Sequence, residues 1–130
     1  MKQNALLAIA SLFSILLFQL HLTDDIIHGI EPGGIQNLIG GTLINLVWLC
    51  GTLLLAKRRS GHVIMLLGGI LAAGVSVLHM NGAGVGGDFA KSPGAFFFIW
   101  TLFALGLTGT FSVILSALGL WSLRSNLQRD

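Results

Sequence analysis

Four long runs without a formal charge constrain this chain more than any other feature of its sequence. They cover residues 5–22, 35–56, 63–80 and 95–123, which are 18, 22, 18 and 29 residues. A transmembrane helix needs about 20 mainly apolar residues, so each run is close to or above the length that crosses a bilayer. The whole chain is 54% hydrophobic and only 9% charged, too little charge to cover a soluble domain. We therefore predict an all-α integral membrane protein, a single domain over residues 1–130 with four transmembrane helices in an antiparallel bundle.

The first apolar run has two interpretations. Lys2 followed by such a run is also typical of a secretory signal peptide. However, Phe18–Thr23 offers no small-x-small cleavage site, so we expect a retained transmembrane helix. We expect this helix to cover residues 5–28 and to stop at Gly29. The alternative is that Thr23 or Asp24 caps a separate short surface helix.

The four predicted helices cover residues 5–28, 35–56, 63–80 and 95–123. On each of them, mostly small or polar residues recur every three or four positions and so form a stripe along one side. Such a stripe is typical of the side that faces other helices in lipid, where close approach and hydrogen bonds replace the hydrophobic drive. The stripes are Ser11, Ser14, Phe18, His21, Asp25 and His28; Asn37, Gly41, Asn45, Trp48 and Thr52; Met65, Gly69, Ala72, Ser76 and His79; and Leu105, Gly109, Ser112, Ser116 and Gly119.

Lysine and arginine lie almost entirely on one side of the predicted bundle. That side holds Lys2, Lys57, Arg58, Arg59, Arg124 and Arg129, whereas the other holds Lys91. The positive-inside rule therefore predicts an inner or plasma membrane protein with both termini cytoplasmic and with loops 29–34 and 81–94 external. The run Lys57–Arg59 is interpreted as a topology determinant, with contact to anionic lipid headgroups as the alternative. We expect no nucleic-acid binding, because this one short basic cluster lies beside lipid.

The acidic residues and histidines gather at the predicted external face. His21 and His79 are each the seventeenth residue of their runs, counted from Ala5 and Val63, so both helices place a histidine at about the same depth. Ionisable groups at membrane depth are costly and usually mark function. The candidate site residues are His21, Asp25, His28 and His79, with Asp24 and Asp88 as additional candidates.

Three interpretations of this cluster remain open. Imidazole and carboxylate groups bind transition metals, and a noncovalent haem between His21 or His28 and His79 is a variant of this. The second is a proton-titrating or small-solute site, since histidine titrates near neutral pH. The third is a structural network in which the histidines bond to Asp24, Asp25 or loop carbonyls. We expect a role in redox chemistry, transport or an accessory function, with a structural or assembly subunit as the alternative, and the sequence identifies no reaction.

Two further groups of residues carry expectations. Aromatic residues near the external face, together with one near the internal face, are interpreted as membrane-interface anchors: Phe89, Phe96, Phe97, Phe98, Trp100 and Trp121. Glycine pairs on three helices predict a homo-oligomer or a membrane partner subunit, because they offer more close-approach surface than one bundle needs: Gly40 and Gly41, Gly68 and Gly69, and Gly106 and Gly109.

Overall fold

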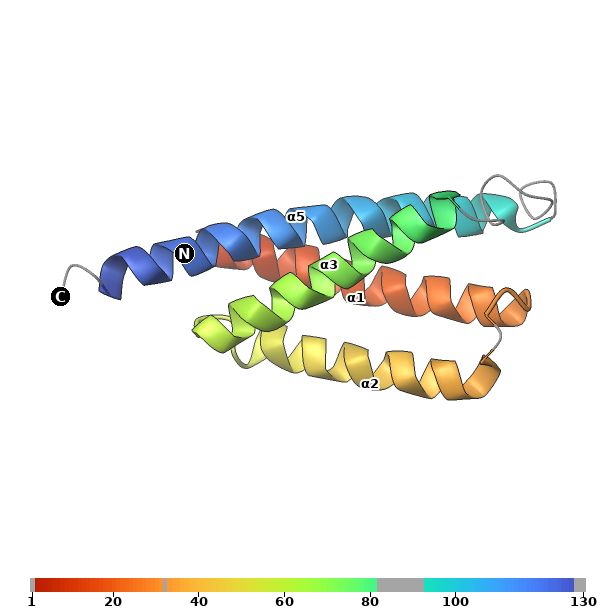
Figure 1. Cartoon of the computed structure of the whole chain (residues 1–130), viewed down its shortest axis with the longest axis horizontal. Helices are drawn as coiled ribbons and strands as arrows, with labels where there is room; N and C mark the ends of the chain where they lie inside the picture. The colour runs from red at the N-terminus through yellow and green to blue at the C-terminus, as the bar shows by residue number, and fades with distance from the viewer. Residues whose placement is uncertain (1, 32, 82–92, 128–130) are drawn as a thin grey trace.

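The computed structural model describes residues 2–31, 33–81 and 93–127. Within these ranges the chain forms four α-helices, packed as an elongated bundle (Figure 1): α1 (Lys2–Ile27), α2 (Gly34–Leu53), α3 (Arg59–Asn81) and α5 (Ala95–Leu127). All four are long and apolar enough to cross a membrane. The predicted all-helical bundle of four helices, each long and apolar enough to span a membrane, is therefore confirmed.

Helix α1 is continuous through the stretch where a second surface helix was the alternative. It ends at Ile27, and Gly29 follows with a φ of +69°. The Gly29 N–H donates to Ile26 O and the Ile30 N–H donates to Asp25 O, at 3.1 and 2.9 Å. This pair of bonds is the Schellman arrangement, which favours glycine because an L side chain is strained at that φ. Asp25 therefore belongs to the last two turns of α1, on the same helix as His21.

The connection between α2 and α3 lies earlier in the chain than the apolar runs suggested. The runs left residues 57–62 between the second and third helices, whereas α2 ends at Leu53 and α3 begins at Arg59. The turn is closed by the Arg58 N–H, which donates to Leu55 O at 2.8 Å, and the His62 N–H then donates to Arg58 O. His62 consequently lies in the first turns of α3 and is only 2% exposed. Helix α5 also extends beyond the predicted limit of 123, to Leu127.

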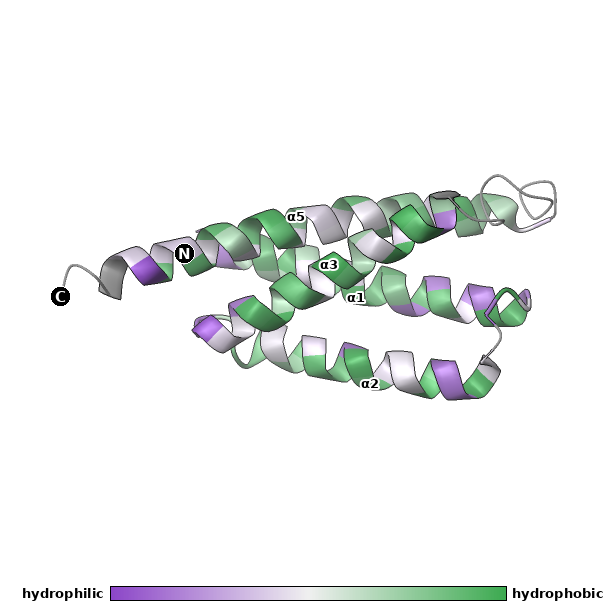
Figure 2. Ribbon diagram, in the orientation of Figure 1, coloured by the Kyte–Doolittle hydropathy of each residue, from purple (hydrophilic) through white to green (hydrophobic). Residues whose placement is uncertain are grey.

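The predicted stripes form the interior of the bundle. Almost all of their members are buried, with Asn37 and His28 as the exposed exceptions. Hydroxyl groups link the helices there: Ser11 Oγ lies 3.0 Å from Ser112 Oγ, and Ser14 Oγ donates to Thr108 Oγ1 at 2.9 Å. Hydrophobic residues cover the rest of each helix and hydrophilic ones gather towards the helix ends (Figure 2). This is the distribution expected of helices surrounded by lipid.

The closest helix approach is between α3 and α5, which share the most extensive interface in the described bundle. A Cβ placed on Gly109 would lie 2.7 Å from Ala72 Cβ and 3.0 Å from Gly69 O. Gly69 in turn faces Gly109 O, at 2.9 Å from its own would-be Cβ. The two backbones therefore touch at a point where only glycine fits on both sides.

Most of the paired glycines are used within the chain itself. A Cβ on Gly41 would meet Leu22, one on Gly68 would meet Trp48, and one on Gly106 would meet Ser76. Gly40 faces open space. The glycine pairs thus serve internal packing, and the expected homo-oligomer or partner subunit stays a prediction without this support.

We expect Gly109→Ala to lower the free energy of unfolding by about 1–3 kcal/mol, because the added methyl meets backbone and a Cβ that cannot rotate away. Gly74→Ala is the matched control, since nothing lies within 4 Å of the position its Cβ would take. Denaturant unfolding of the two variants in the same detergent measures the difference. Equal stability of the two variants would contradict the close contact of α3 with α5.

Candidate functional site

The C-terminal parts of α1 and α3 bring three of the predicted site residues together. His21 and Asp25 lie one turn apart on α1, and His79 lies near the end of α3. The His21 and His79 rings are in edge-to-face contact, with centroids 4.9 Å apart and planes at 83°. The structure thus shows the proximity that the equal depth of the two histidines predicted. One ligand atom from each of His21, Asp25 and His79 lies within 4.8 Å of the others, close enough to hold a metal ion.

Both imidazoles point at the same carboxylate oxygen. His79 Nε2 lies 3.1 Å from Asp25 Oδ2, and His21 Nε2 lies 3.7 Å from that same atom. Asp25 and His21 are buried, at 3% and 2% exposure, and His79 is partly buried. A carboxylate this far from water needs compensating positive charge or hydrogen-bond donors.

His79 is held in place by a second hydrogen bond on its other nitrogen. Its Nδ1 lies 2.9 Å from Val75 O, one turn back on α3. A neutral imidazole carries one N–H, yet both nitrogens of His79 face an oxygen that accepts. The geometry therefore requires one more positive species at Asp25 and His79: an additional proton on either group, or a metal cation between them.

His21 differs from the other three histidines, all of which lie in the described part of the chain. His28, His62 and His79 each place Nδ1 on a carbonyl oxygen four residues earlier: Asp24 O, Arg58 O and Val75 O. Within the described residues neither ring nitrogen of His21 has a hydrogen-bond partner, and the same holds for Asp25 Oδ1. Leaving a buried polar group unpaired costs about 1–3 kcal/mol, so a ligand bound to this ring would offset that cost.

The Phe98 ring of α5 packs against both histidine rings of the site. Its ring centroid lies 4.8 Å from that of His21 and 5.7 Å from that of His79. It is fully buried, whereas its neighbours Phe96 and Phe97 are 81% and 47% exposed. The interpretation of Phe98 as a membrane-interface anchor was therefore wrong. A signal for its position existed, because extending the α5 stripe backwards from Leu105 in steps of three and four reaches Leu102 and then Phe98.

The other candidate residues that the structure describes lie apart from this group. His28 follows the end of α1, with Nδ1 3.4 Å from Asp24 Oδ1 in addition to its bond to Asp24 O. Its Nε2 faces Gly94, just before α5, at 3.2 Å from where a Cβ would stand. Asp88 lies outside the described residues. Lys57, Arg58 and Arg59 lie at the α2–α3 connection, and all three are exposed.

The arrangement of the rings bears on the haem interpretation. Axial histidines stand on opposite faces of the macrocycle, with the iron and the porphyrin plane between them. The His21 and His79 rings are in direct contact and converge on one carboxylate oxygen. This leaves no layer between them for a porphyrin, so a small ion fits the pair and a haem shared by these two residues does not.

Comparison of the chain with protein-family models, with curated proteins and with solved structures finds no match. The chemistry of the site therefore rests on its own geometry.

We expect His79 Nδ1 to carry a proton in every state of the protein, because Val75 O can only accept a hydrogen bond. Nitrogen NMR of protein with ¹⁵N-labelled histidine measures this, and His79→Gln assigns the signal by its loss. Added Zn²⁺ should shift the Nε2 resonance and leave Nδ1 protonated. An unprotonated Nδ1 in the metal-free protein would contradict the bond to Val75.

Proposed function

We propose that this chain is an integral membrane protein that binds one divalent transition metal ion between His21, Asp25 and His79. One observation carries the proposal: at Asp25, a pair that lacks a positive charge lies beside a buried histidine that lacks a hydrogen-bond partner among the described residues. The His79–Asp25 pair needs a positive species, and the buried His21 ring needs a partner. A metal ion satisfies both requirements, whereas an additional proton shared by His79 and Asp25 satisfies only the first.

The ligand set suits a borderline metal such as Zn²⁺ or Fe²⁺. Two imidazoles and one carboxylate form open sites for both ions, with bonds of about 2.0–2.2 Å. Tetrahedral ligands at that bond length stand about 3.3 Å apart. The distances of 3.1 and 3.7 Å from Asp25 Oδ2 to the two Nε2 atoms bracket this spacing. All three ligand atoms lie within 4.8 Å of one another, so the two imidazoles would move closer together on binding one ion. Three protein ligands leave a coordination position for water or another small ligand.

A proton-sharing site is the second candidate function. The separation of 3.1 Å between His79 Nε2 and Asp25 Oδ2 is already a hydrogen-bond length, so one proton completes this pair without a metal. In that case the cluster ties α1 to α3 and responds to pH, while neither nitrogen of His21 gains a hydrogen-bond partner from the described residues. This is the form that a purely structural role of the cluster would take.

We place the site at the external face of an inner or plasma membrane, in an antiparallel bundle with both termini cytoplasmic. Two observations support this arrangement. The basic residues in the described part of the chain lie away from the site, at the start of α1, at the α2–α3 turn and near the end of α5. The contacts of α3 with α5 also run in opposite chain order, since His62 packs against Gly119 and His79 against Phe98.

We expect the purified protein to bind about one Zn²⁺ or Co²⁺ per chain, and His79→Ala or Asp25→Asn to weaken binding more than about 100-fold by removing a ligand. His62→Ala is the control, because His62 is as buried as Asp25 but lies near the opposite end of α3 from His79. Calorimetric titration in detergent gives affinity and stoichiometry, and Co²⁺ absorption reports the ligand geometry.

Two outcomes would contradict the metal proposal. Binding that survives Asp25→Asn at full affinity would place the ion elsewhere. If no ion binds, and His21→Ala and Asp25→Ala only lower the melting temperature, the cluster is structural.

We expect a cysteine at Gln36 to react with an impermeant thiol reagent on intact cells, and one at Ser60 to remain unlabelled. Both positions are exposed, and they lie at opposite ends of the α2 segment. The native Cys50 is first replaced by serine, because it is exposed on α2. The reverse labelling would move the His21–Asp25–His79 site to the cytoplasmic face.

A further inference from the structure

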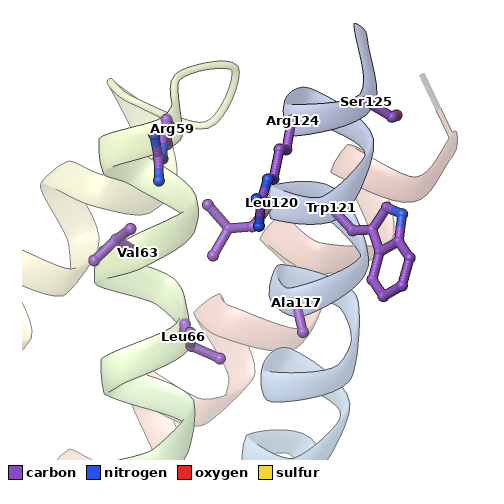
Figure 3. Close-up of a pocket in the computed structure, with 8 residues that line it drawn as sticks. All are labelled: Arg59, Val63, Leu66, Ala117, Leu120, Trp121, Arg124 and Ser125. Carbon is purple, nitrogen blue, oxygen red and sulfur yellow. The ribbon is translucent and has the colours of Figure 1, made fainter. Parts of the chain in front are cut away.

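A groove of about 580 Å³ lies between the start of α3 and the last turns of α5, far from the histidine site. Arg59 stands on one side of it and Arg124 on the other (Figure 3). Figure 3 shows both side chains directed along the groove, with Leu120 between them. Of the residues that line this groove, the two arginines are the only charged ones.

Below the arginines the groove is apolar. Val63 and Leu66 of α3 line it together with Ala117 and Leu120 of α5 (Figure 3). A cavity for a free anion would need polar groups on these walls, whereas a hydrocarbon chain needs none. A charged rim over an apolar trough is complementary to a molecule with an anionic head and an apolar tail.

The two arginines of the rim, Arg59 and Arg124, lie at a level that suits a lipid headgroup. The segments that are long and apolar enough to span a membrane begin at Arg59 in α3 and end at Ser125 in α5, so a bilayer across them would have both guanidinium groups at its boundary. Trp121 on the outer side of α5 is 77% exposed, as expected of a side chain at the headgroup level. Arg59 is also the first residue of α3, where free backbone N–H groups favour an anion.

We infer that this groove is a binding site for one anionic phospholipid. Arg59 and Arg124 hold the phosphate from two sides, and an acyl chain lies against Val63, Leu66 and Leu120. Guanidinium groups bind phosphate oxygens through paired hydrogen bonds, which two arginines on separate helices can direct at one headgroup. The site goes beyond general attraction of the Lys57–Arg59 run to the membrane, because it uses Arg124 from α5 and excludes Lys57 and Arg58.

Native mass spectrometry of the full chain in detergent, titrated with phosphatidylglycerol, tests the inference. We expect R59Q/R124Q to weaken the first binding event about 30-fold. K57Q/R58Q is the matched control, since it removes the same charge at the same end of the protein but outside the groove, and we expect a change below about threefold. Phosphatidylcholine with the same acyl chains should bind the unaltered protein about tenfold more weakly than phosphatidylglycerol.

A second variant separates loss of the site from loss of the fold. Leu66→Trp fills the groove while keeping both arginines, and it should also weaken phosphatidylglycerol binding about tenfold. If R59Q/R124Q and K57Q/R58Q lost the same phosphatidylglycerol affinity, the effect would be one of surface charge alone and the inference would be overturned. Displacement of the lipid by equimolar glycerol phosphate would equally overturn it, by showing that the site recognises a free phosphate rather than a lipid.

Discussion

The backbone contact between α3 and α5 at Gly69 and Gly109 sets the position of everything else in the bundle. Lipid provides little hydrophobic drive for helix association, so close packing and hydrogen bonds must hold the helices together. With the two backbones in contact, Ser76 Oγ reaches Leu102 O at 2.9 Å on one side, and Ser112 Oγ reaches Met65 O at 3.3 Å on the other. The same register carries His79 to Phe98 at one end and His62 to Gly119 at the other. A change at the glycine contact is therefore felt at both ends of the molecule.

Helix α1 then completes the site on this α3–α5 frame. Its serines bond to Thr108 and Ser112 of α5, which fixes how far α1 slides along its neighbour. That offset brings His21 against Phe98 and Asp25 against His79. Burying the polar side chains of this cluster costs free energy. The packing of α1, α3 and α5 offsets this cost and leaves the side chains no other arrangement. A cation at Asp25 would remove much of that cost, so metal binding and stability should be coupled.

Most of the interior was readable from the sequence, because a helix that faces protein on one side and lipid on the other repeats its small residues every three or four positions. The His21–His79 proximity followed from equal depth on two helices. Phe98 was missed because three consecutive phenylalanines look alike in composition, and only the phase of the α5 stripe tells the buried one from the exposed ones. His62 was missed because its burial depends on Gly119, a residue far away in sequence that leaves room for the ring. The sequence could not distinguish a metal-binding cluster from a proton-sharing one, because the difference depends on which histidine nitrogens face which oxygens.

The interior between the two ends favours an ion that stays bound over one that passes through a single chain. Ser11, Ser14 and Ser112 are fully buried, and each hydroxyl already bonds to another hydroxyl or to a carbonyl. Leu7 and Leu105, both at 0% exposure, fill the space around them. A hydrated or partly hydrated cation would have to break these bonds and displace packed side chains along most of the membrane thickness. This packing therefore argues against a path for a cation through the described part of the bundle.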